Sequence, residues 1–210
     1  MPGRNSRASP SPRYVEHARE GNVPVPEEPI YFEKAVFSIV AHDQPVIYPP
    51  DLGRIDPEVE LAVIIGTRAS AVREAEAGAF IAGYTILNDV TARDLQRKDI
   101  ANRHPWYRSK SLDTFCPVGP WIITADEIDP REALSIQLRV NGEARQNSST
   151  RHIVFQVPAL VSRISEIITL EPGDIISTGT PEGIAPVYPG DVMECEIEKI
   201  GILRNPVRKS

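Results

Sequence analysis

Cysteines, basic runs and long apolar stretches are scarce in this sequence, and each scarcity narrows the class of protein. Cys116 and Cys195 are the only two cysteines among 210 residues. They lie far apart in sequence beside apolar residues, which favours two reduced thiols in an intracellular protein over a disulfide framework. The 23 lysines and arginines are outnumbered by 29 aspartates and glutamates, which gives a net charge of −6. Without a basic run to follow a phosphate backbone, we expect no nucleic-acid partner.

A membrane-spanning or exported protein is not indicated either. No segment approaches the roughly 18 consecutive apolar residues that a spanning helix needs. Residues 1–12 are polar, unlike a secretory signal. We therefore expect no membrane partner and a cytoplasmic location. The 41% of hydrophobic residues suffices for one sizeable core, which predicts a single domain over residues 14–210.

Proline is abundant, with 20 of 210 residues, nearly twice the usual ~5%. This content favours short strands and fixed turns over long helices. Residues 1–13 are rich in Ser, Pro and Arg and predict a flexible or irregular segment. Residues 14–20 can form a short helix, which the prolines of residues 23–29 must interrupt. We interpret residues 14–30 as a mobile lid on a stiff hinge.

Two apolar segments in the first half predict buried strands. Residues 58–66 (EVELAVIIG) begin with alternation and end in a β-branched run, as a strand buried on both faces does. Residues 70–80 have a helical pattern, residues 82–87 form a second apolar strand, and residues 91–101 return to helical spacing. Asp89 therefore lies at a junction between a strand and a helix.

The second half is mostly β in pattern. Asn141-Gly142 is a strong hairpin signal because both positions tolerate positive φ. The strands predicted in this half cover residues 135–140, 143–146, 175–178 and 192–197. One helix is predicted at Pro158, with an apolar stripe formed by Leu160, Val161, Ile164, Ile167 and Ile168. Together these elements predict a mixed α+β, β-rich fold with few short helices.

Three carboxylates stand at the ends of the two predicted buried strands. Glu58 and Glu60 are two residues apart, so on a strand they project from the same face. Two like charges beside an apolar strand repel unless a cation lies between them. Arginine or lysine could be that cation, with a solvated strand end as the result. Asp89 could likewise simply cap the helix that follows it.

A metal site is the other reading of these carboxylates. Three oxygen donors without cysteine or clustered histidine favour Mg²⁺, Mn²⁺ or Ca²⁺ over Zn²⁺ or Cu⁺. We predict that Glu58, Glu60 and Asp89 bind one hard divalent cation. Mg²⁺ is the first choice, with waters completing about six positions.

Other candidate residues have local patterns that admit two readings. His17 and Glu20 are spaced i, i+3, so a short helix would place them on one face, as either a surface contact or an oriented base. Arg93 and Gln96 share a helix face in the same way. Lys110 could be an ordinary surface charge.

Thr180 lies in the sequence TGTPEG, whose glycines let backbone N–H groups approach an anion. The spacing of these glycines fits neither nucleotide-binding fingerprint. A turn that binds a carboxylate is the reading that remains.

Seven strings in order make the sequence resemble the fumarylacetoacetate hydrolase family. They are YVEHARE (14–20), EEPIYFEK (27–34), EVELAVIIG (58–66), GYTILNDVTARDLQ (83–96), SKSLDTFCPVGP (109–120), VNGEARQ (140–146) and ITLEPGDIISTGTPEGI (168–184). The resemblance extends over about residues 14–207. It implies a mixed β-roll fold, a homodimer, and a metal site at Glu58, Glu60 and Asp89.

The resemblance also implies a substrate class, the 2-oxo acids. Such an acid offers a carboxylate oxygen and a ketone oxygen to one cation, which stabilises the enolate as a Lewis acid. We predict hydrolysis or decarboxylation of a C–C bond next to a 2-oxo acid, with acylpyruvates or oxaloacetate-like acids as substrates. Residues 183–192 (GIAPVYPGDV) resemble members that act on hydroxyheptadienedioate-type acids, so an isomerase or decarboxylase of aromatic catabolism is the alternative.

Residue roles follow from the matched positions. The resemblance implies that His17 is the base of the lid, oriented by Glu20, and that Lys110 lies near the metal. It points Arg93, Gln96 and Thr180 towards substrate. Beside these, we expect Asp113 to brace Lys110 and Asp94 to brace its helix. The remaining histidines are expected to be structural or peripheral; they are His42, His104 and His152.

The N-terminus departs from the family pattern. Family members usually have a Gly-Arg-Asn-Tyr-like turn just before the lid helix, whereas here eight residues separate Gly3-Arg4-Asn5 from Tyr14. This departure lies beside the expected base. A non-catalytic homologue that binds a metal and a 2-oxo acid is therefore a third reading.

Overall fold

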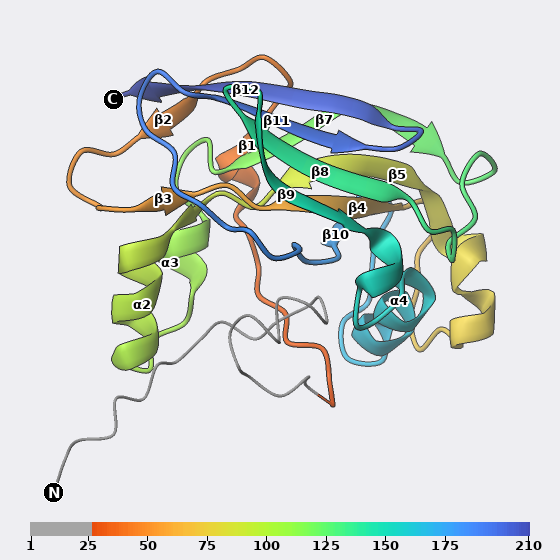
Figure 1. Cartoon of the computed structure of the whole chain (residues 1–210). Coiled ribbons are helices and arrows are strands. Elements are labelled where there is room, and N and C mark those ends of the chain that lie inside the picture. Colours follow the sequence, from red (N-terminus) through yellow and green to blue (C-terminus); the bar gives the residue numbers. More distant parts are fainter. Residues whose placement is uncertain (1–26) are drawn as a thin grey trace, which may run out of the picture.

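The computed structural model describes residues 27–210 and shows two curled five-stranded sheets that lie one above the other (Figure 1). The first sheet has the order β1 (Ile39–Val40), β7 (Cys116–Thr124), β5 (Ile81–Asn88), β4 (Val59–Ile65) and β10 (Ile175–Ser177). The second has the order β2 (Val46–Tyr48), β12 (Gly201–Lys209), β11 (Val192–Ile197), β8 (Ser135–Val140) and β9 (Glu143–Ser149). A small ladder pairs β3 (Ile55–Asp56) with β6 (Thr91–Ala92).

The helices are short and lie at the ends of the sheets. α2 (Arg93–Ala101) and α3 (Tyr107–Lys110) are at one end, and α4 (Val157–Ser165) is at the other (Figure 1). The 3₁₀ helices are η1 (Val36–Ser38), η2 (Glu74–Phe80) and η3 (Thr150–His152). This architecture confirms the predicted β-rich fold class with few short helices. None of the helices within residues 27–210 combines the length and apolar character that crossing a bilayer requires.

The main core lies between the two sheets. In β11, Met193, Cys195 and Ile197 are buried and alternate with less buried glutamates, as the sequence predicts. β4 is buried along almost its whole length because both of its faces are covered: one face belongs to the main core, and Ala62 on the other belongs to a second, smaller cluster. The Asn141-Gly142 hairpin joins β8 to β9, with both residues at positive φ.

Three predicted helices differ from the structure in extent. The segment 70–80 is helical only as η2, because Ala71 adopts a φ of 49° and breaks the pattern. The helix expected over residues 91–101 begins at Arg93, because Thr91–Ala92 pairs with β3. α4 ends at Ser165, and the chain then turns so that Leu170 can pair with Ala69. The predicted stripe is therefore wrong at its far end, where Ile167 and Ile168 are exposed.

Candidate metal centre

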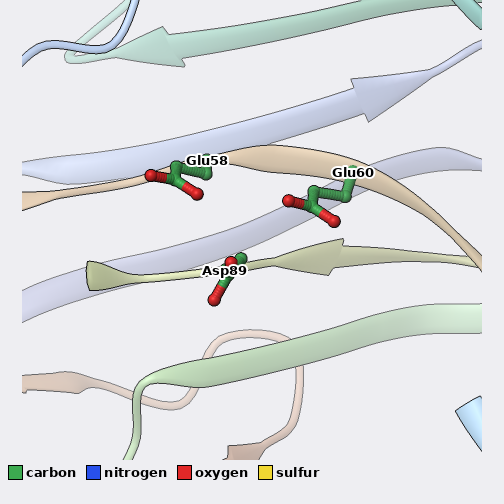
Figure 2. A group of neighbouring side chains, drawn as sticks. All are labelled: Glu58, Glu60 and Asp89. Carbon is green, nitrogen blue, oxygen red and sulfur yellow. The ribbon is translucent and has the colours of Figure 1, made fainter. Parts of the chain in front are cut away.

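Glu58, Glu60 and Asp89 meet where β4 begins and β5 ends. The two strands are antiparallel, with Val59 opposite Asn88 and Glu60 opposite Leu87. The backbone N–H of Asp89 donates to the carbonyl of Glu58 at 2.9 Å, which extends this ladder by one step. Figure 2 shows Glu58 and Glu60 side by side on one strand and Asp89 on the next. The structure thus brings together the three predicted ligand residues.

The donor set of this acidic triad fits a divalent cation. One ligand oxygen from each residue lies within 4.8 Å of the others, and opposite ligands of an octahedral Mg²⁺ lie about 4.2 Å apart. The exposed fractions of Glu58, Glu60 and Asp89 are 5%, 2% and 3%. Three like charges buried so close together are unfavourable without positive charge among them. Carboxylate oxygens also match the hard cations.

Two lysines supply part of that positive charge. Lys110 Nζ lies 2.9 Å from Glu58 Oε2 and 2.5 Å from Asp89 Oδ2, and Lys34 Nζ lies 2.7 Å from Asp89 Oδ1. Burial alone would raise the pKa of Asp89, but Lys110 and Lys34 outweigh it and hold that pKa far below its ordinary value. Lys110 is buried, and its Nζ lies 5.2 Å from the centre of the Phe32 ring. Lys110 therefore lies beside the triad, as the resemblance implied.

Sequence reasoning missed Lys34. Its ammonium also donates to the carbonyl of Lys110 at 2.5 Å, so it joins two segments at the triad. Lys34 ends the string EEPIYFEK, and it is 55 residues from Asp89 in sequence. No periodicity connects residues so far apart, and the family string was the only available signal.

Glu60 is held by residues 177–184, the Thr180 loop, which begins at the end of β10. Gly179 N–H donates to Glu60 Oε2 at 2.8 Å, and Ser177 Oγ donates to the same oxygen. Thr180 Oγ1 accepts from Gln146 Nε2 at 2.8 Å. Gln146 in turn accepts from Val59 N–H at 3.1 Å. Gln146, which had no predicted role, therefore ties the Thr180 loop to β4.

Arg93 and Gln96 lie together on the buried face of α2. Arg93 donates to Gln96 Oε1 at 2.6 Å, to Asp56 Oδ2 at 2.7 Å and to Glu58 Oε1. The Glu58 and Asp56 carboxylates raise the pKa of the guanidinium further, although burial opposes them. Arg93 thus contacts a triad member directly and Gln96 is bonded to Arg93, and their contact with substrate stays a prediction.

The expected braces differ in outcome. Asp94 Oδ2 accepts from the backbone N–H of Arg54 at 2.9 Å and so does fix the start of α2. Asp113 is exposed, whereas the described bonds of Lys110 go to Glu58 and Asp89, so the predicted brace of Lys110 by Asp113 is wrong. Asp89 does not cap α2, because its carboxylate is occupied by the two lysines.

The remaining predicted residues lie elsewhere. His17, Glu20 and most of the proposed lid, together with the segment 1–13, fall outside the described residues. The three other histidines have partners away from the triad: His42 accepts from Arg204 N–H, His104 lies near Asp99, and His152 lies near Ser148. Both cysteines are buried and free, which confirms the expectation of reduced thiols.

Comparison with known proteins identifies the family. The family profile "Fumarylacetoacetate (FAA) hydrolase C-terminal" matches residues 11–208. An uncharacterized protein of Methanocaldococcus jannaschii is 51% identical over 93% of this chain and 79% of its own length. A mitochondrial oxaloacetate tautomerase of Bos taurus is 44% identical over 92% of this chain and 63% of its own length.

A solved structure agrees in fold. Fumarylpyruvate hydrolase from Pseudomonas aeruginosa, in complex with Mn²⁺ and pyruvate, has a TM-score of 0.89 and 32% identity. The match covers 94% of this chain and 87% of that one. The mixed β-roll implied by the resemblance is therefore confirmed. This chain belongs to the fumarylacetoacetate hydrolase family.

Proposed function

We propose that this chain is a divalent-metal-dependent enzyme that interconverts the keto and enol forms of a 2-oxo acid of the oxaloacetate class. Family members are enzymes that act on 2-oxo acids. The observation that carries the proposal is the buried triad of Glu58, Glu60 and Asp89, with ligand oxygens within 4.8 Å of one another and Lys110 beside them. The 44% identity to a tautomerase supports keto–enol chemistry over other reactions.

Glu58, Glu60 and Asp89 would hold the cation. The oxygen-only donor set favours Mg²⁺, with Mn²⁺ or Ca²⁺ as alternatives, and the related hydrolase was solved with Mn²⁺. When bound, the cation supplies a Lewis acid that favours negative charge on substrate oxygens.

The chain's own residues bind the substrate and move the proton. Lys110 holds a buried ammonium beside the triad, where it stabilises negative charge on an incoming carboxylate or enol oxygen. Arg93, Gln96 and Thr180 are proposed to orient the substrate. His17, held by Glu20, is proposed to carry the proton between C3 and solvent once the lid closes.

A second candidate reaction is the C–C cleavage predicted from the sequence. The 32% identical fumarylpyruvate hydrolase favours hydrolysis of an acylpyruvate, and decarboxylation of an oxaloacetate-like acid would use the same enol. These reactions differ from tautomerisation in what happens at C3. Hydrolysis needs water activated by His17, whereas tautomerisation needs only a proton.

The experiment is a metal-dependent assay on both substrate types. Protein stripped with EDTA is given Mg²⁺ or Mn²⁺, and loss of the oxaloacetate enol is followed by ultraviolet absorbance while pyruvate and acylpyruvate cleavage are followed by chromatography. We expect metal-dependent enol loss without carbon loss, abolished in E60Q. Pyruvate formation would establish the second candidate instead. Bound metal with no turnover on any 2-oxo acid would support the non-catalytic homologue.

We also propose a homodimer in the cytoplasm, as the family resemblance and the sequence composition predict. Light scattering after size exclusion should then give about twice the chain mass of 23.2 kDa. A mass of one chain would contradict the dimer. Cell fractionation tests the location.

A further inference from the structure

Asp56 is a buried carboxylate that lies just outside the triad. Its side chain is fully buried on β3, where it accepts from Arg54 Nε at 2.6 Å and from Arg93 Nε at 2.7 Å. A buried charge is costly unless it is paired and hydrogen-bonded, and Asp56 meets both conditions with two guanidiniums. No role in metal or substrate binding was expected for it.

The β3–β6 ladder fixes Asp56 relative to α2. Asp56 is paired with Thr91 and Ile55 with Ala92, and β6 continues directly into α2. In addition, the backbone N–H of Arg93 donates to the carbonyl of Arg54 at 2.8 Å. The first residue of α2 is therefore placed against Asp56 by backbone bonds as well as by its side chain.

Arg93 connects Asp56 to the triad, because it contacts both Asp56 and Glu58. Its guanidinium is a rigid plane, so fixing two of its nitrogens fixes the direction of the third. Asp56 holds Nε and Gln96 holds Nη1 at 2.6 Å, which leaves Nη2 directed at Glu58 Oε1. The other oxygen, Glu58 Oε2, lies 2.9 Å from Lys110 Nζ, on the side of Asp89.

Arg54 extends the same network to the Thr180 loop. While its Nε is held by Asp56, its Nη2 donates to the carbonyl of Ile184 at 3.2 Å. Asp56 thus lies between two arginines that reach different parts of the site: one contacts a triad carboxylate and the other contacts the loop that holds Glu60.

We propose that Asp56 is a positioning residue for the metal centre, which acts through Arg93 to orient the Glu58 carboxylate towards the cation. The proposal rests on the proposed function, because it requires that the triad binds a metal. Asp56 does not touch the cation or the substrate in this scheme. Its removal should leave all three ligands present but Glu58 poorly aligned.

The test is Mn²⁺ affinity, measured by isothermal titration calorimetry on D56N and on a matched control, D99N. Asp99 is also fully buried and lies on α2, and its described side-chain partners are Arg108 at 2.9 Å and His104, neither of which belongs to the triad. Loss of a group that orients a ligand typically weakens metal binding by about 10- to 100-fold. We expect that loss in D56N, and a change below about twofold in D99N.

Thermal unfolding in EDTA separates an effect on the alignment of the Glu58 ligand from an effect on the stability of the fold. D56N removes the charge from two Asp–Arg pairs and D99N removes it from one, so both should lower the melting temperature, and only D56N should lower Mn²⁺ affinity. Should D56N not fold, R93K replaces it, because lysine keeps the charge but cannot hold Asp56 and Glu58 together. R93K should show the same 10- to 100-fold loss.

The outcomes distinguish the two proposals. Wild-type affinity in folded D56N or R93K would overturn the positioning role while leaving the proposed function intact. Equal affinity losses in D56N and D99N would overturn it too, since a general loss of rigidity would then suffice. If the wild-type protein itself binds no Mn²⁺, the proposed metal-dependent function fails, and the positioning role fails with it.

Discussion

At the scale of single residues, the acidic triad combines mutual repulsion with a proposed metal-binding role. Glu60 is buried next to Glu58 and Asp89, and its Oε2 accepts from Gly179 N–H at 2.8 Å. A glutamine at this position could still accept that bond through its amide oxygen, but it would carry no charge. We therefore expect the charge of Glu60 to matter for binding the proposed cation.

Replacing Glu60 by glutamine should separate binding from stability. We expect E60Q to lose Mn²⁺ affinity by more than about 100-fold, because one of three charged ligands is gone. In EDTA its melting temperature should match or exceed that of the wild type, since a buried like charge has been removed. Calorimetric titration and thermal unfolding measure the two effects. A marked drop in the melting temperature in EDTA would show that the Glu60 charge stabilises the fold.

The two cysteines are predicted to be inert in the folded protein. Burial raises the pKa of the Cys116 thiol to about 12 and raises that of Cys195 as well. Because the thiolate is the reactive form, an aromatic disulfide reagent at pH 8 should label neither residue in the native state and both in denaturant. Rapid native labelling of either thiol would contradict its burial.

The raised pKa of Cys116 also predicts that the free energy of unfolding falls in alkaline solution. The folded pKa of Cys116 lies above the unfolded value of roughly 8.5, so the folded state keeps a proton that the unfolded state loses. The contribution of the protonated Cys116 thiol to stability is complete below about pH 8.5 and is lost progressively towards about pH 12. Urea unfolding at several pH values should show this decline, reduced in C116A. An identical decline in C116A would assign it to other groups.

At the scale of elements, sequence reasoning succeeded where the relevant residues are close along the chain. The two-residue spacing placed Glu58 and Glu60 on one face, and the end of the next strand placed Asp89 beside them, because β4 and β5 are consecutive and paired. Asp56 and Lys34 were missed as contributors. Arg93, through which Asp56 reaches the triad, and Asp89, the partner of Lys34, are 37 and 55 residues away in sequence, and spacing carries no information on contacts over such separations.

The Thr180 loop depends on a glycine for its course. Gly183 has a φ of +91°, and a Cβ atom there would lie 2.1 Å from the carbonyl oxygen of Arg145. Gly173 has a similar φ of +96° but open space around it, so it is a matched control. G173A should cost about 1 kcal/mol from backbone strain alone.

We expect G183A to cost at least about 2 kcal/mol more, because β9 and the loop must move apart. Turnover should fall as well, since the displaced loop also holds Glu60. Urea unfolding and the enol assay measure the two effects. Equal stability of G183A and G173A would indicate that the loop does not need this close approach.

At the scale of the whole molecule, the proposed metal would act as a cross-link between separate parts of the chain. Asp89 is 31 residues beyond Glu58, and Glu60 is held by Ser177 and Gly179 of the Thr180 loop, so the site exists only when both strands and the loop are assembled. An unfolded chain presents the same carboxylates scattered in water. Binding should therefore select the folded state.

This coupling predicts a melting temperature that depends on free Mn²⁺. Above the dissociation constant, each tenfold rise in Mn²⁺ should add about 1.4 kcal/mol to the free energy of unfolding, and 100 times that constant should add about 2.7 kcal/mol. Differential scanning calorimetry over a Mn²⁺ series checks the slope, and EDTA should reverse it. E60Q should give a flat line over the same range, because its fold is intact but its site is incomplete. A flat line for the wild-type protein up to millimolar Mn²⁺ would leave the triad as an ion-pair cluster with its lysines, and the enol chemistry would then need another source of positive charge.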